Sequence, residues 1–133
     1  MRDIEFRGKR IDNGEWVEGY YYKAKYYRTD DELCDYITVP HPKEYNEPSS
    51  HYMVNPETVG QYTELKDKNG TKIFEGDIGR RRDDIFLIDW SEEKAAFVMI
   101  FNDYICEILY LEEMWDDAEV IGNIHDNPEL LEV

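Results

Sequence analysis

Hydrophobic and polar positions alternate along this chain in short stretches, which is the pattern of β-strands with one buried face. Ile4 to Arg7 and Trp16 to Tyr20 alternate in this way on either side of the turn sequence Asp12-Asn13-Gly14. The two stretches therefore predict a β-hairpin, whose second strand is expected to continue through a run of tyrosines to Tyr27. Two further strands are predicted at Tyr36–Val39 and Tyr52–Val54. The segment between them, His41–Ser50, is predicted to be an irregular loop.

In the second half of the chain, short apolar stretches are separated by tight turns, which predicts a meander of antiparallel strands. Its strands are expected at Ile85–Trp90, Ala95–Phe101, Ile105–Leu111 and Val120–Ile124. Single helical turns are expected at Glu112–Ala118 and Pro128–Leu131. A meander entered through Glu75-Gly76-Asp77-Ile78 is typical of a five-stranded barrel. The expected fold is mostly β, with an N-terminal β-hairpin region over residues 1–60, a C-terminal SH3-like small β-barrel over residues 61–133, and few short helices.

The alternation also predicts which side chains form the core of that barrel. Phe86, Ile88 and Trp90 share one face of their strand, and Phe97 and Met99 share one face of the next. The predicted core comprises Ile78, Phe86, Ile88, Trp90, Phe97, Met99 and Ile121.

The segment Gln61–Ile78 is rich in turn residues. Asn69-Gly70 is the pair that favours a type I′ hairpin turn, which needs positive φ at both positions. Gly76-Asp77 predicts a second break before an apolar strand. Asp67-Lys68-Asn69-Gly70 also begins like a calcium loop, but Gly is missing at the sixth loop position and Glu at the twelfth. The sequence therefore favours a turn over a ligand site.

Three separated motifs give the chain a resemblance to a known family. They lie at Met1–Gly19, at Asn55–Ile78 with its core Gln-Tyr-Thr-Glu-Leu-Lys-Asp-Lys-Asn-Gly, and at Val120–Leu131. In this order they resemble the YopX family of small phage and prophage proteins. The chain departs from that family's pattern at Glu64, where Gly is usual, and at Phe74, where Tyr is usual. A Glu costs free energy at positive φ where Gly does not. The resemblance implies an accessory protein of phage type, without an established biochemical activity.

The formal net charge of −16 is concentrated in the C-terminal part of the 133-residue chain. Residues 83–133 contain 15 acidic side chains and the single basic residue Lys94, whereas residues 1–82 contain 16 acidic and 14 basic ones. Binding to a phosphate backbone requires clustered Lys and Arg, so no nucleic-acid partner is expected. The acidic residues are expected to increase solubility. Alternatively, they make the protein an acidic decoy that mimics nucleic acid and occupies a basic protein.

The sequence indicates a cytoplasmic protein without a membrane partner. The longest apolar run, Ala95–Phe101, is far shorter than the roughly 20 residues that span a bilayer. No signal peptide opens the chain. Cys34 and Cys106 are expected to be reduced, and neither belongs to a zinc signature, so no cofactor is expected.

Candidate catalytic groups are scattered. His41 and His51 lie ten residues apart without a carboxylate at chelating spacing, and His125 lies in a turn motif. The adjacent carboxylate pairs are Asp83-Asp84, Glu92-Glu93, Glu112-Glu113 and Asp116-Asp117. Such pairs on exposed turns normally stay ionised, whereas catalytic pairs need different environments. The only basic run, Arg80-Arg81-Arg82, is expected to form internal ion pairs. We therefore expect no catalytic residues and no enzyme.

Aromatic residues offer the best candidate for an interaction surface, because Tyr and Trp are enriched at protein interfaces. The candidate residues are Trp16, Tyr20, Tyr21, Tyr22, Tyr26 and Tyr27. Cross-strand packing within a sheet is the competing interpretation, and the sequence leaves both open. The favoured function is a protein–protein interaction module that self-associates as a homo-oligomer or binds a host or phage protein. The alternatives are the acidic decoy and, less favoured, a small metal-dependent hydrolase.

Overall fold

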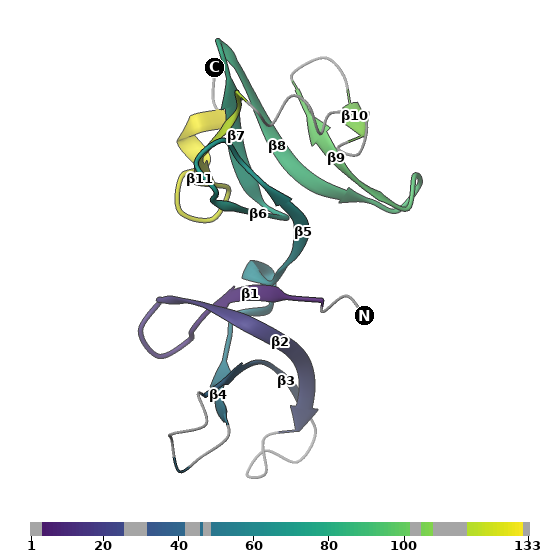
Figure 1. Cartoon of the computed structure of the whole chain (residues 1–133). Helices are drawn as coiled ribbons and strands as arrows, with labels where there is room; N and C mark the ends of the chain where they lie inside the picture. Colours follow the sequence, from purple (N-terminus) through teal and green to yellow (C-terminus); the bar gives the residue numbers. More distant parts are fainter. Residues whose placement is uncertain are drawn as a thin grey trace. The chain divides into compact units, whose positions relative to one another are not determined.

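In a computed structural model of the chain, the structure describes residues 4–25, 32–41, 46, 49–101, 105–107 and 117–131. The described chain is mostly β, and it forms two compact units, Met1–Gln61 and Tyr62–Val133 (Figure 1). The helical parts are short: η1 (Pro56–Thr58) in the first unit and η3 (Pro128–Leu131) in the second are single 3₁₀ turns. The mostly β fold with few short helices is thus confirmed.

The first unit is an antiparallel sheet built from consecutive strands. Its strands are β1 (Phe6–Lys9), β2 (Trp16–Lys25), β3 (Leu33–Pro40), β4 (Ser49–Met53) and the beginning of β5 (Gly60–Lys66). They are hydrogen-bonded in the order β4-β3-β2-β1-β5. The predicted hairpin is confirmed as β1–β2. Its loop closes through a hydrogen bond of 2.9 Å from the Arg10 N–H to the Glu15 carbonyl, and Gly14 supplies a φ of +71°.

The end of β4 returns to the end of β1. A bridge joins Arg10 to Val54, the Ile11 N–H donates to the Met53 carbonyl at 3.0 Å, and the Asn55 N–H donates to the Lys9 carbonyl at 2.9 Å. Four short strands therefore run almost all the way round a small core. Its centre is formed by side chains that are fully buried, Ile37 and Val54.

The second unit continues β5 into a hairpin with β6 (Lys72–Phe74) and then forms a second antiparallel sheet. That sheet comprises β7 (Asp77–Arg81), β8 (Asp84–Ser91), β9 (Ala96–Ile100), β10 (Ile105–Glu107) and β11 (Glu119–Asn123). The strand order β10-β9-β8-β7-β11 confirms the meander and places the last strand beside the first (Figure 1). This connection is the one that a small closed barrel uses, and closure of an SH3-like barrel stays a prediction.

The core of the second unit agrees with the predicted set except at one position. Ile78, Phe86, Ile88 and Met99 are buried, Phe97 packs against the core cluster, and Ile121 is half-buried. Trp90 was expected in the core, and this prediction is wrong, because 39% of Trp90 is exposed. Trp90 is the penultimate residue of β8, in the part of the strand that extends beyond the core. There its ring meets the edge of Phe97 at a centroid distance of 5.0 Å.

The turn between β5 and β6 differs in type from the prediction. Gly70 has a φ of +80°, but Asn69 does not have positive φ, so the type I′ assignment is wrong. The Asp67 carboxylate explains the difference, since its Oδ1 accepts from the N–H groups of Asn69 and Thr71, each at 2.9 Å. The chain turns at Asp67–Gly70, where the Gly70 N–H donates to the Asp67 carbonyl at 3.0 Å. The second predicted break is confirmed by Gly76, with a φ of +92°.

Several sequence predictions fall wholly or partly outside the described residues. Tyr26, Tyr27, Glu112–Asp116, most of His41–Ser50 and the stretch 108–111 are among them. The predicted helical turn at Pro128–Leu131 is confirmed by η3.

Candidate interaction surface on the first unit

The sheet of the first unit has one buried face and one open face. Val17, Gly19 and Tyr21 of β2 turn toward the buried core, because residues of a strand alternate between its faces. Trp16, Tyr20 and Tyr22 therefore lie together on the other face. The register places two residues of β3, Thr38 and Tyr36, opposite Tyr20 and Tyr22, and His51 of β4 opposite Thr38. We call Trp16, Tyr20, Tyr22, Tyr36 and His51 the aromatic face.

The centre of the aromatic face is held by stacking and hydrogen bonds. Tyr22 stacks on Tyr36 with ring centroids 5.1 Å apart and an angle of 12° between the planes. The His51 ring meets Tyr22 edge-on, with centroids 5.8 Å apart. His51 Nδ1 lies 3.0 Å from the Tyr22 hydroxyl and 2.9 Å from Thr38 Oγ1. These contacts fix the side-chain rotamers in advance, which lowers the entropy that a binding partner would have to remove.

The two ends of the aromatic face differ in chemistry. Tyr20 is 44% exposed, which makes it one of the large hydrophobic residues that the described structure leaves open. At the other end, Trp16 lies beneath two cations of β1: the Arg7 guanidinium carbon is 4.6 Å and Lys9 Nζ is 5.7 Å from its ring centroid. Both distances are within the range of cation–π contact. The face thus combines exposed aromatic surface with a rim that carries positive charge.

Tyr21, also predicted as part of the interaction surface, lies on the buried face. Its ring contacts Phe6 at a centroid distance of 5.3 Å, and its hydroxyl donates to the buried carboxylate of Asp35. Burial, followed by the hydrogen bond and the negative charge of Asp35, raises the pKa of Tyr21 to about 12. Tyr21 therefore serves the core of the unit.

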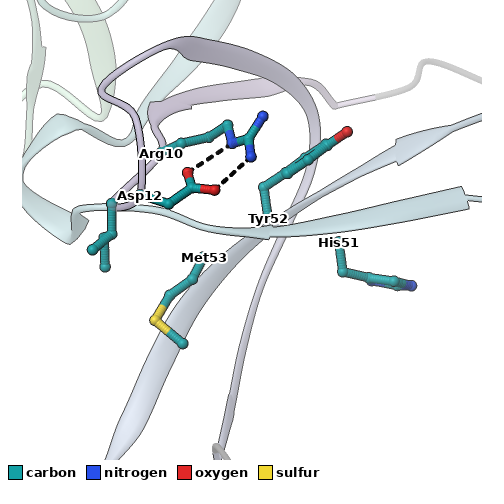
Figure 2. Close-up of a pocket in the computed structure, with 6 residues that line it drawn as sticks. Arg10, Asp12, His51, Tyr52 and Met53 are labelled. Atoms are coloured by element: carbon teal, nitrogen blue, oxygen red, sulfur yellow. Dashed lines mark hydrogen bonds and ion pairs between the residues drawn. The ribbon is translucent and has the colours of Figure 1, made fainter.

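A hollow of about 380 Å³ lies beside the edge strand β4, and the sequence reasoning missed it. It is lined by Arg10, Ile11, Asp12, His51, Tyr52 and Met53 (Figure 2). Arg10 donates from Nε and Nη2 to the two carboxylate oxygens of Asp12 at 2.9 and 2.6 Å, and its guanidinium lies over the Tyr52 ring at 4.3 Å. The spacing Arg10-x-Asp12 at the end of a strand was the available signal.

The ion pair in this hollow is already complete within the chain. The hydrogen bond to Asp12 raises the pKa of Arg10, and the same bond lowers the pKa of Asp12. Figure 2 shows Tyr52 on the side of Arg10, with His51 and Met53 leaving the strand on the opposite side. The hollow is therefore a neutral notch that borders the aromatic face at His51.

Comparison with known proteins assigns the chain to a family. The family model described as YopX protein matches residues 5–132, nearly the whole sequence. The chain belongs to the YopX family. A solved structure, the crystal structure of protein EF1440 from Enterococcus faecalis, is similar with 26% identity and a TM-score of 0.57, over 99% of this chain and 100% of that one. Among curated proteins, no relative matches.

Arg80, Arg81 and the acidic residues that they contact have structural roles in this YopX family protein. Arg80 and Arg81 form the predicted internal ion pairs, with Glu119 at 2.7 Å and Asp117 at 2.6 Å. Hydrogen bonds from these arginines lower the pKa values of both carboxyl groups. The predicted internal ion pairing is thus confirmed for these two arginines of β7, whose partners lie at the start of β11 and just before it.

The histidines and cysteines show no shared site in the described chain. His41 Nε2 lies 2.6 Å from Ser50 Oγ, the His125 N–H donates to Asn123 Oδ1 at 3.0 Å, and Cys34 is a free thiol. No group of three or more His, Cys, Asp or Glu residues that could hold a metal ion occurs among the described residues. Within the same residues, no helix is long and apolar enough to cross a membrane.

Proposed function

We propose that this YopX family protein is a non-enzymatic accessory protein of a phage or prophage that acts in the bacterial cytoplasm. It binds other protein chains, including a second copy of itself, through the first unit. The observation that carries the proposal is the aromatic face, in which exposed Tyr20 adjoins the fixed cluster of Tyr22, Tyr36 and His51.

The physical properties of the aromatic face match those of protein interfaces. Tyr and Trp provide large contact areas and lose little rotamer entropy, and they dominate the energetic hot spots of interfaces. Tyr22 and Tyr36 are already stacked, so the conformational entropy of their side chains is lost on folding and not on binding. A sheet face with preordered rings suits the surface of another folded protein.

The distribution of charge favours the first unit as the contact region. Residues 1–61 carry 12 acidic and 8 basic side chains, whereas residues 62–133 carry 19 acidic and 7 basic ones. Association between two copies, or with another acidic bacterial protein, meets less electrostatic repulsion at the first unit. The same negative charge supports the proposal that the intact protein binds no nucleic acid.

The acidic decoy is the competing binding function, and one observation bears on it. A decoy needs carboxylates that are available to a basic partner, but Asp117 and Glu119 are engaged by Arg81 and Arg80. The two functions also respond differently to salt, because contacts between exposed charges are screened and aromatic contacts are not.

Capture of proteins from a lysate of the bacterial host tests the proposal. The tagged protein is incubated at about 0.05 M and at about 0.5 M salt, and the bound proteins are quantified by mass spectrometry. The proposed function predicts a set of partners whose amounts are equal at the two salt concentrations. Partners that are basic and disappear at high salt would instead support the decoy and contradict the proposal.

A further inference from the structure

The chain contains two Asn-Gly pairs, and both lie in loops between paired strands. Asn13-Gly14 lies between β1 and β2, and Asn69-Gly70 lies between β5 and β6. All four residues are exposed, and a Cβ atom at either glycine would meet nothing within 4 Å. Because glycine has no side chain, its backbone nitrogen is open to attack the carboxamide of the preceding asparagine. Both pairs are therefore candidates for spontaneous deamidation.

The Asn13 side chain is held close to the backbone that follows it. Its Oδ1 accepts a hydrogen bond of 2.9 Å from the Glu15 N–H, which forms an Asx turn. This bond keeps the carboxamide near the peptide unit of Gly14, which contains the attacking nitrogen. Negative charge develops on Oδ1 during the attack, and a hydrogen bond to an anionic oxygen is stronger than one to a neutral oxygen. The Glu15 N–H thus stabilises the tetrahedral intermediate more than the resting side chain.

The environment of Asn69 is less favourable for the same reaction. Among the described residues, no hydrogen bond holds the Asn69 carboxamide. The N–H groups of Asn69 and Thr71, on either side of Gly70, instead donate to Asp67 Oδ1, each at 2.9 Å. Loss of the Gly70 amide proton would place a second negative charge beside the Asp67 carboxylate, and like charges disfavour such an ionisation.

One restraint is common to the two turns and does not distinguish them. The Gly14 N–H donates to the Arg10 carbonyl at 2.9 Å, and the Gly70 N–H donates to the Asp67 carbonyl at 3.0 Å. Each bond slows the loss of the proton that the attack requires. The difference lies in the neighbouring charge, because the carboxylate next to Asn13-Gly14, that of Asp12, is paired with Arg10 at 2.6 Å.

We propose that Asn13 is a site of spontaneous deamidation, which reacts several times faster than Asn69 in the folded protein. The Gly14 nitrogen loses its proton to water and forms a bond to Asn13 Cγ, and the carboxamide nitrogen takes up a proton and leaves as ammonia. Water then adds to one of the two carbonyl groups of the resulting succinimide and breaks its C–N bond. The product is aspartate or isoaspartate, according to which bond breaks.

The modification changes the charge at one end of the aromatic face. Either product adds a negative charge to the loop that joins Lys9 to Trp16, which are paired across β1 and β2. Isoaspartate also adds a methylene group to the main chain of this loop, between the two residues whose N–H and carbonyl close it, Arg10 and Glu15. This chemistry does not depend on which partner binds the aromatic face.

The test follows both asparagines during one incubation of the full-length protein at constant pH and temperature. Mass spectrometry of proteolytic peptides gives the rate of deamidation at each site. We expect Asn13 to react at least about fivefold faster than Asn69, the ratio that corresponds to one hydrogen bond of ordinary net strength. In protein unfolded by urea, where these contacts are absent, the two rates should become similar. Equal rates in the folded protein, or a ratio that survives unfolding, would overturn the proposal.

Two substitutions of Glu15 test the hydrogen-bond donor itself. Glu15→Pro removes the N–H that Asn13 Oδ1 accepts, whereas Glu15→Ala keeps this N–H and is the matched control. Glu15→Ala should retain the wild-type ratio of rates, and Glu15→Pro should lower the Asn13 rate toward that of Asn69. Circular dichroism establishes that both variants are folded. A folded Glu15→Pro protein with the wild-type rate at Asn13 would overturn the role of this donor. If proline unfolds the protein, the comparison of folded and unfolded wild type still decides the proposal.

Discussion

At the scale of single residues, Glu64 is held in a conformation that suits glycine. Its φ is +73°, and it lies where β5 departs from regular pairing with β6, between Tyr62 and Lys66. Thr63 stabilises this irregular stretch by donating from Oγ1 to the Ile73 carbonyl at 2.7 Å. Glycine would adopt this conformation without the steric cost that the Cβ atom of Glu64 imposes.

We predict that Glu64→Gly stabilises the protein. Relief of the left-handed conformation, less the entropy cost of glycine, should raise the free energy of unfolding by about 0.5–1 kcal/mol. The matched control Glu64→Ala removes the same side chain and keeps the Cβ atom that causes the strain. Urea denaturation of the two variants measures the difference. Equal stability of the Gly and Ala variants would mean that the backbone here is not strained.

Tyr21 makes the stability depend on pH in the alkaline range. Its pKa is raised from 10.0 to about 12 in the folded protein, mainly by burial. The protonated Tyr21 hydroxyl therefore contributes its full stabilisation of the folded state below pH 10. This contribution to the free energy of unfolding is lost as the pH rises from 10 toward 12. We expect Tyr21→Phe to remove this part of the alkaline destabilisation. Urea denaturation across this pH range should show a flatter decline for the variant; parallel declines would contradict the assignment.

Sequence reasoning at this scale found residue types but not their conformations. It identified Gly70 and Gly76 as turn residues, and both have positive φ. It missed that Asp67 binds the N–H groups of the turn and so imposes a different turn type. The sequence likewise named Trp16, Tyr20 and Tyr22 among the candidates for an interaction surface, but Tyr36 and His51 come from other strands. The position of Tyr36 and His51 on this face depends on the register between strands, which local sequence does not determine.

At the scale of elements, the Asp67 carboxylate connects the β5–β6 turn to the last strand. Oδ1 accepts from the turn, and Oδ2 accepts from the Val120 N–H of β11 at 2.9 Å. Asp67→Asn keeps an oxygen for the turn but replaces the acceptor of Val120 with a donor. We expect it to cost about 1–3 kcal/mol. Asp67→Ala, which loses all three bonds, should cost more in the same denaturation experiment, and the reverse order would contradict this role.

The strands of the second unit provide a test of how far alternation defines the core. Phe86 is fully buried, whereas Phe97 is partly buried and packs against the core cluster. Phe86→Ala should therefore destabilise the protein by about 3–5 kcal/mol, and Phe97→Ala by distinctly less. Thermal unfolding of the two variants measures the order. Equal losses would show that Phe97 belongs to the core as fully as Phe86.

Alternation predicted the elements well because it reflects burial on one face, which is a local property. Strands β8, β9 and β11 lie close to their predicted positions. The failure at Trp90 has the same origin, since the pattern continues along β8 after the strand has left the core. The closing bridge from Arg10 to Val54 joins residues 44 positions apart, and no periodicity signals such a contact.

At the scale of the whole molecule, the two units divide charge and aromatic surface between them. The second unit holds most of the excess acidity, and the first carries the aromatic face. This division is visible in the sequence as a count of charges, although the sequence alone could not show that Tyr21 contacts the core side of the sheet while Tyr20 is exposed. It leads to a simple expectation: partners bind the first unit, and the acidic unit keeps the protein dispersed.

The most direct test of this account compares Tyr20→Ser with Trp90→Ala in quantitative capture of partners from the host lysate. Both variants remove a large aromatic side chain of similar exposure, 44% for Tyr20 and 39% for Trp90, but from different units. Truncation of an interface hot spot costs at least about 2 kcal/mol, so Tyr20→Ser should reduce the captured amount at least about tenfold. Trp90→Ala should capture as much as the wild type. Equal capture by the two variants, or a loss confined to Trp90→Ala, would contradict the assignment of binding to the aromatic face.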